Sequence, residues 1–129
     1  MPNPLYKKLG LKDGQKVILV NIPVNYFDLL VEVPDVEEAE LDDLADFVHV
    51  FESSLSALEI SFAEAFERLA PKGMIWVSWP KKTSKVPTDL DYHVAKSVAA
   101  KHGMFDVKVS AIDEIWTACK YIVPLKNRK

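Results

Sequence analysis

Polar side chains gather at the ends of three apolar runs in this sequence, where together they could bind a small ligand. The runs cover residues 17–20, 47–51 and 74–79, and each has the composition of a strand buried in a sheet. Ligands bind outside the carboxyl ends of parallel strands, so the residues that end or follow these runs form the candidate site. They are Asn21, Asn25, Glu52, Ser53, Trp79, Lys81, Lys82 and Thr88.

The chemistry of this set is mixed: a carboxylate, two amides, two hydroxyls, an indole and two ammonium groups. The two lysines favour an anionic ligand, as do the backbone N–H groups of helices expected to begin near Ser53 and Thr88. The alternative interpretation is that these side chains cap helices and satisfy loop backbone. We name no catalytic residue.

The sequence lacks the motifs of several common metal-binding, nucleotide-binding and catalytic sites. The three histidines have no zinc-ligand spacing, and His49, within an apolar strand, is expected to be a core histidine with a satisfied ring. The single cysteine, Cys119, excludes an intrachain disulfide and a multi-cysteine metal site. No phosphate-binding P-loop or Gly-x-Ser-x-Gly motif occurs. We therefore expect no metal and no cofactor.

The elements that must position these residues alternate along the chain. The sequence predicts strands at 16–20, 36–40, 46–51, 74–79, 105–112 and 115–123, although 35–41 also fits a helix. Helices are expected after Asn25, after Ser53 or Ser54, and from Thr88 to His102. Such alternation predicts a mostly parallel α/β sheet with right-handed crossovers. The last two strands are joined by a tight turn and should be antiparallel.

The expected fold is thus a single three-layer Rossmann-like domain over residues 1–129, with strand order 2-1-3-4-6-5. Residues 1–15 are interpreted as a basic lead-in and 125–129 as a basic tail. The length of 129 residues suits one domain, and no apolar run is long enough to cross a membrane. The cytoplasm is the expected compartment.

Charge is divided unevenly along the chain. Residues 17–67 hold thirteen acids and no Lys or Arg, whereas residues 68–129 hold twelve bases and five acids. This division predicts a protein partner or head-to-tail self-association through opposite charges. The alternative is a solvated acidic edge. We find no clear nucleic-acid signal.

Residues 69–78, Leu-Ala-Pro-Lys-Gly-Met-Ile-Trp-Val-Ser, together with the antiparallel ending, resemble the methyltransferase-like Rossmann fold. There a Leu-x-Pro-Gly-Gly type of turn leads into an apolar strand. The resemblance implies a Gly-x-Gly-x-Gly loop after the first strand, and an acidic residue ending the second, for which Glu38 or Glu40 would serve.

This sequence departs from that pattern, because Asn21-Ile22-Pro23-Val24-Asn25 contains no glycine. Ile22 and Val24 would bring Cβ groups toward a ligand, and Pro23 lacks an N–H donor. We therefore predict no useful binding of S-adenosylmethionine and no methyltransferase activity.

Three further segments carry a second resemblance. Residues 76–82, 88–90 and 107–116 resemble domain-of-unknown-function family 3052, a family of small bacterial proteins. That label implies the fold and names no reaction. Our first hypothesis is a non-enzymatic binding or regulatory module. The alternative is an enzyme or a binder of anionic small molecules with a pocket at the carboxyl ends of the strands.

Overall fold

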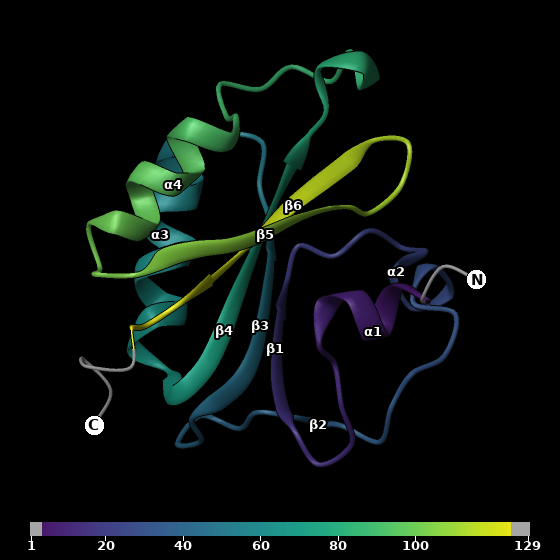
Figure 1. Cartoon of the computed structure of the whole chain (residues 1–129), viewed down its shortest axis with the longest axis vertical. Helices are drawn as coiled ribbons and strands as arrows, with labels where there is room; N and C mark the ends of the chain where they lie inside the picture. Colours follow the sequence, from purple (N-terminus) through teal and green to yellow (C-terminus); the bar gives the residue numbers. More distant parts are fainter. Residues whose placement is uncertain (1–3, 125–129) are drawn as a thin grey trace.

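The computed structural model describes residues 4–124, which form a six-stranded sheet in the order β2-β1-β3-β4-β6-β5 (Figure 1). β1, β2, β3 and β4 are parallel, and β6 is antiparallel to both β4 and β5. The predicted fold class, strand order and antiparallel edge are confirmed. The strands are β1 (Lys16–Val20), β2 (Glu37–Glu38), β3 (Ala45–Phe51), β4 (Leu69–Pro80), β5 (Phe105–Ala111) and β6 (Trp116–Ile122).

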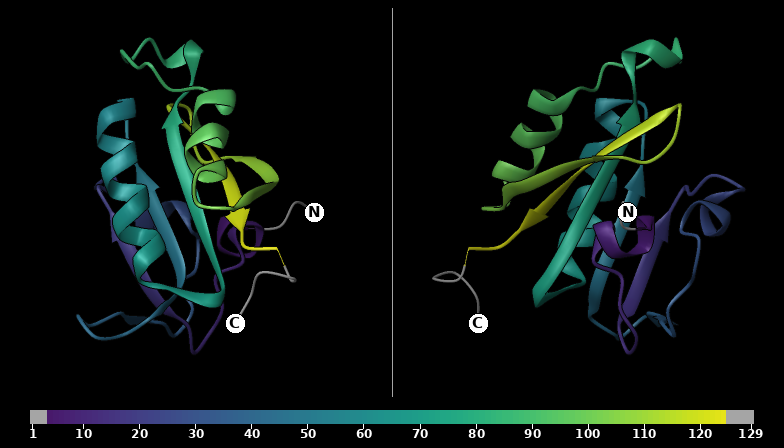
Figure 2. Two further views of the ribbon diagram at one scale, coloured as in Figure 1. Left: turned by 90° about the vertical axis from the view of Figure 1, so that its left-hand side faces the viewer. Right: turned by 45° about the vertical axis from the view of Figure 1, so that its right-hand side comes forward.

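Helices cover both faces of this sheet. Figure 2 shows α3 and α4 on one side and α1 on the other. The helices are α1 (Leu5–Leu9), α2 (Tyr26–Leu29), α3 (Leu55–Glu67) and α4 (Tyr92–Ala100), with a 3-10 turn, η1, at Lys82–Ser84. Within residues 4–124, no helix has the length and apolar character needed to cross a bilayer.

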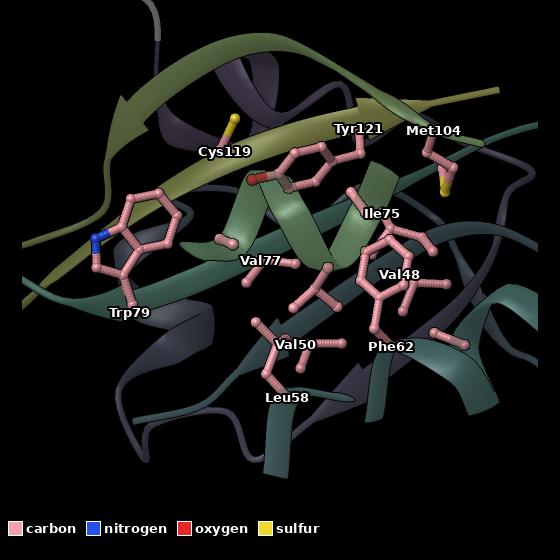
Figure 3. Close-up of a cluster of buried hydrophobic side chains, with 14 of the residues drawn as sticks. Val48, Val50, Leu58, Phe62, Ile75, Val77, Trp79, Met104, Cys119 and Tyr121 are labelled. Atoms are coloured by element: carbon pink, nitrogen blue, oxygen red, sulfur yellow. The ribbon is translucent and has the colours of Figure 1, made fainter. Parts of the chain in front are cut away.

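The core on the α3 side is built from the inward faces of β3 and β4 (Figure 3). Val48 and Val77 are fully buried there, against Leu58 and Phe62 on α3. The two α3 residues are four apart, so they lie on one face of the helix. Burying a side chain of this size stabilises the fold by about 1.5–3 kcal/mol.

The second core lies under α1, in the segment that we had interpreted as a basic lead-in. Leu5 and Leu9 are buried, and Trp76 Nε1 donates to the carbonyl of Leu9 over 2.7 Å. Gly10, with φ of 83°, ends the helix. Five residues are too few to show a helical period, so the sequence pattern did not reveal α1. The predicted basic tail at 125–129 lies outside the described residues.

Three element boundaries differ from prediction. β4 begins at Leu69, and Gly73 lies in its irregular first half, where a Cβ would come within 2.9 Å of the Ala45 carbonyl oxygen. β2 spans only two residues, not five. α4 begins at Tyr92, because Asp91 is its N-cap and accepts the N–H of Val94 over 2.8 Å. Thr88 is therefore not the cap.

β5 is an edge strand with an interrupted register. The pairing with β6 shifts between Asp106 and Lys108, which leaves Val107 in a bulge. Phe105, Val107 and Val109 are all about half exposed. This edge of the sheet therefore presents apolar side chains to solvent.

Candidate functional site

Glu52 lies directly after β3, next to the end of β1. This is the point at which the strand order reverses, so it is the expected ligand position in an open parallel sheet. The Glu52 side chain is nearly buried, and its Oε2 accepts hydrogen bonds from Asn21 Nδ2, at 3.2 Å, and from Ser61 Oγ. Oε1 makes no hydrogen bond with the residues that the structure describes. One carboxylate oxygen is thus held in place while the other can accept from a ligand.

Asn21 turns the chain after β1 with a φ of 56°, in the left-handed region that glycine normally supplies. Asparagine tolerates this conformation better than other non-glycine residues. The side chain of Val24 is fully exposed. Ile22 is half-buried and lines a cavity on the α2 side of the sheet.

The N-terminus of α3 is already occupied by groups of this chain. Asp89 Oδ1 accepts the N–H of Leu55 over 2.7 Å, and Ser54 Oγ accepts the N–H of Ala57. Thr88 Oγ1 donates to the carbonyl of Ser53 over 2.6 Å. These bonds fasten the loop after β4 to α3, so an anionic ligand loses the helix N–H group that we expected it to use.

Of the remaining predicted residues, Trp79 lies next to Glu52, because the carbonyl of Ser78 accepts the N–H of Glu52 over 3.1 Å. Trp79 is 6% exposed and belongs to the α3-side core, so its indole is not a surface platform (Figure 3). Lys81 donates its backbone N–H to the carbonyl of Ile115, and Lys82 is exposed in η1. Asn25 is exposed at the start of α2 without a capping bond. The structure therefore joins Asn21 to Glu52 and Thr88 to Ser53. Ligand binding by these residues stays a prediction.

Sequence reasoning missed Ser61 and Asp89, which both bind groups at this edge of the sheet. Asp89 and Leu55 are 34 residues apart, and no local pattern indicates such a contact. Ser61 could have been found, because it follows Glu52 by nine residues and lies in the second turn of the helix that comes next.

Glu38, which the methyltransferase resemblance offered as the acidic residue at the end of the second strand, lies elsewhere. It pairs with Val17 in the first half of β1. β1 continues to Val20, so Glu38 is about 10 Å short of the strand end. Glu38 therefore does not lie at the strand ends where Asn21 and Glu52 meet.

Three buried polar side chains, Tyr26, His49 and Ser78, are linked by hydrogen bonds in the core next to α2. Tyr26 Oη and His49 Nδ1 are 2.9 Å apart, and His49 Nε2 and Ser78 Oγ are 2.6 Å apart. Burial lowers the pKa of His49 to about 3 and raises the pKa of Tyr26. The prediction of a core histidine with a satisfied ring is confirmed. Ser78 is fully buried and hence inaccessible as a nucleophile.

No group of three or more His, Cys, Asp or Glu residues within the described part of the chain is placed to hold a metal ion. No family model matches the sequence, so membership of family 3052 is not confirmed. No curated protein matches it either.

Solved structures do match the fold. A putative methyltransferase from Thermoplasma acidophilum is 11% identical, with a TM-score of 0.58 over 97% of this chain and 76% of that one. The magnesium protoporphyrin IX methyltransferase of Synechocystis PCC 6803 with bound SAH is 7% identical, with a TM-score of 0.62 over 93% and 78%. A SAM-dependent methyltransferase from Aquifex aeolicus is 14% identical, with a TM-score of 0.57 over 93% and 88%. At such identities the likeness establishes a methyltransferase-like fold.

These comparisons contradict our prediction that the chain is not an enzyme and has no methyltransferase activity. Several structures that share its fold over nearly its whole length are methyltransferases, including a glycopeptide N-methyltransferase. The lack of glycine is also no obstacle to the turn itself, because Asn21 adopts the left-handed conformation there.

Proposed function

We propose that this protein is an enzyme of the methyltransferase class, with its methyl-donor site at the carboxyl ends of β1 and β3. The observation that carries the proposal is Glu52, a nearly buried carboxylate at the strand-order reversal with one unbonded oxygen. A carboxylate in that position favours a cationic ligand. S-adenosylmethionine, which several structural neighbours bind or depend on, carries an ammonium and a sulfonium group.

The chain's own residues would bind and orient this ligand. Asn21 and Ser61 fix Oε2 of Glu52, which leaves Oε1 to accept a hydrogen bond from the ammonium group. Holding the carboxylate beforehand reduces the entropy lost on binding. When bound, the donor supplies an electrophilic methyl group. An anionic ligand is less well supported, because Asp89 occupies the nearest helix N-terminus.

Titration calorimetry with S-adenosylmethionine and S-adenosylhomocysteine tests the proposal. We expect the wild-type protein to bind at least one of them with a dissociation constant of about 10 µM. Glu52→Gln should weaken binding at least about tenfold, since the amide keeps the shape and can still accept from Asn21 and Ser61 but carries no charge. The matched control is Glu67→Gln, an exposed carboxylate at the other end of α3.

Two results would contradict the proposal: no saturable heat with either compound, or equal affinities for wild type and Glu52→Gln. The melting temperatures of both variants show whether a loss of binding reflects unfolding. Release of S-adenosylhomocysteine in the presence of methyl acceptors then separates an enzyme from a protein that only binds the donor.

A further inference from the structure

A cavity of about 450 Å³ lies on the α2 side of β1, between that strand and the segment that leads to β2. Its floor is formed by Val17 and Leu19, which β1 turns toward α1 and α2. The volume falls within the range of small-molecule sites. The lining residues are Leu11, Val17, Leu19, Ile22, Tyr26, Phe27, Leu30, Val33, Pro34, Asp35, Val36 and Glu38.

The cavity exists because the connection between β1 and β2 contains little helix. Parallel strands are normally joined by a crossover helix that covers the sheet. Here residues 21–36 make the connection, and only Tyr26–Leu29 is helical. The rest runs as a loop along the edge of the sheet, as the long segment between α2 and β2 in Figure 1 shows. The loop therefore borders this face of β1 without covering it, and the uncovered space is the cavity.

All charged residues that line the cavity are acidic. The lining holds two carboxylates, Asp35 and Glu38, and no Lys, Arg or His. The side chain of Glu38 makes no hydrogen bond or ion pair with the described residues. Asp35 also borders a neighbouring hollow that contains Lys7 and Lys12, so Glu38 is the more distinctive acid.

Two aromatic rings also line this cavity. Tyr26 and Phe27 meet edge to face, with ring centroids 5.5 Å apart. Tyr26 is buried and fixed through its hydroxyl by His49, whereas Phe27 is about half exposed. Aromatic faces attract ammonium groups, most strongly when water is excluded. Rings, apolar walls and an unpaired carboxylate together suit one kind of ligand.

We propose that this cavity binds a small molecule with an apolar body and one ammonium group. The apolar part packs on Val17, Leu19 and Ile22, and the cation lies near Glu38 and the aromatic corner. The site is separate from Glu52, because its floor is the face of β1 and Glu38 pairs at the beginning of that strand. It does not depend on the proposed methyl-donor site.

Three probes of one shape test the charge preference: 2-naphthylmethylammonium, 2-naphthylmethanol and 2-naphthoate. We expect saturable amide shifts in NMR spectra at residues 17–38 with the ammonium probe, at a dissociation constant below about 1 mM. The neutral alcohol should bind about tenfold more weakly, and the carboxylate should give no saturable shift. Glu38→Gln should bring the ammonium probe to the affinity of the alcohol and leave the alcohol unchanged.

The controls separate this cavity from the rest of the molecule. Glu64→Gln, an exposed carboxylate on the opposite side of β1, should change nothing. Glu52→Gln should also leave the ammonium probe unaffected, so the two proposals can fail independently. Leu19→Trp should abolish all binding by filling the cavity. Equal binding of the three probes, shifts outside residues 17–38, no saturable shift, or full affinity in Glu38→Gln would overturn the proposal.

Discussion

At the scale of single residues, His49 makes stability depend on pH. Its pKa in the folded protein is about 3 because burial penalises the charged ring, against 6.5 for an exposed histidine. Between these values the unfolded chain binds a proton that the folded chain does not. The free energy of unfolding should therefore fall as the pH drops below 6.5, by up to about 1.4 kcal/mol per unit.

Urea unfolding at pH 7, 6 and 5 measures this slope. His49→Gln should be less stable than wild type, because it disturbs the bonds to Tyr26 and Ser78, and its slope should be flatter. The control is His93→Gln, which makes the same substitution at an exposed histidine. The same slope in His49→Gln and wild type would refute a buried neutral histidine.

At the scale of elements, the loop after α2 holds a strained residue. Val31 has a φ of 75°, which is unfavourable for a β-branched side chain and costs about 1–3 kcal/mol. Glycine at this position removes the strain but loses about 0.5–1 kcal/mol of backbone entropy on folding. Val31→Gly should therefore raise the free energy of unfolding by about 1 kcal/mol, as measured by urea unfolding.

Val24 provides the matched control for that substitution. It is an exposed valine just before α2, and its φ is not positive. Val24→Gly should destabilise slightly, because no strain is relieved. If both glycine variants destabilise equally, then Val31 is not strained.

The elements that the sequence predicted well have long patterns. α3 repeats apolar residues at steps of three and four, and β3 is mostly apolar, so the start of α3 and both ends of β3 were expected within a residue. α1 and β2 were missed or overextended because five and two residues carry too little pattern. The start of α4 was misplaced because Thr88 and Asp91 are both good N-cap residues. In the structure the Thr88 hydroxyl donates to the carbonyl of Ser53, and Asp91 is the cap.

The residues of the candidate site also differ in whether the sequence could predict their positions. Asn21 and Glu52 could be predicted because both follow strands, and parallel strands end at one edge of the sheet. Trp79 could not be placed, since the residue at the end of a strand can face the core or the ligand, and here it faces the core. Asp89 depends on a fold that brings residues 34 positions apart into contact.

At the scale of the whole molecule, the strand order places the acidic and the basic segments of the chain in opposite halves of the sheet. The acidic segment 17–67 contains β2, β1 and β3, which are adjacent in the sheet. The basic segment supplies β4, β6 and β5 on the other side. We propose that opposite edges of two copies attract each other head to tail.

Sedimentation velocity at two salt concentrations tests this attraction. The average mass should rise with protein concentration at about 20 mM salt and fall to that of one chain at about 0.5 M, where charges are screened within a few ångströms. Lys108→Glu, on the exposed basic edge, should weaken association at low salt. A single-chain mass in both buffers would leave only a different protein as partner.

The bulge at Val107 has a consequence for how concentrated samples behave. An exposed edge strand with apolar side chains is a template for fibrils, which require many identical strands to stack in register. The extra residue bends β5 and breaks its ladder, and Lys108 places a charge beside the break. Deleting Val107 would give a regular, flatter edge. Such a variant should bind the amyloid dye thioflavin T on storage at concentrations at which the wild-type protein stays clear.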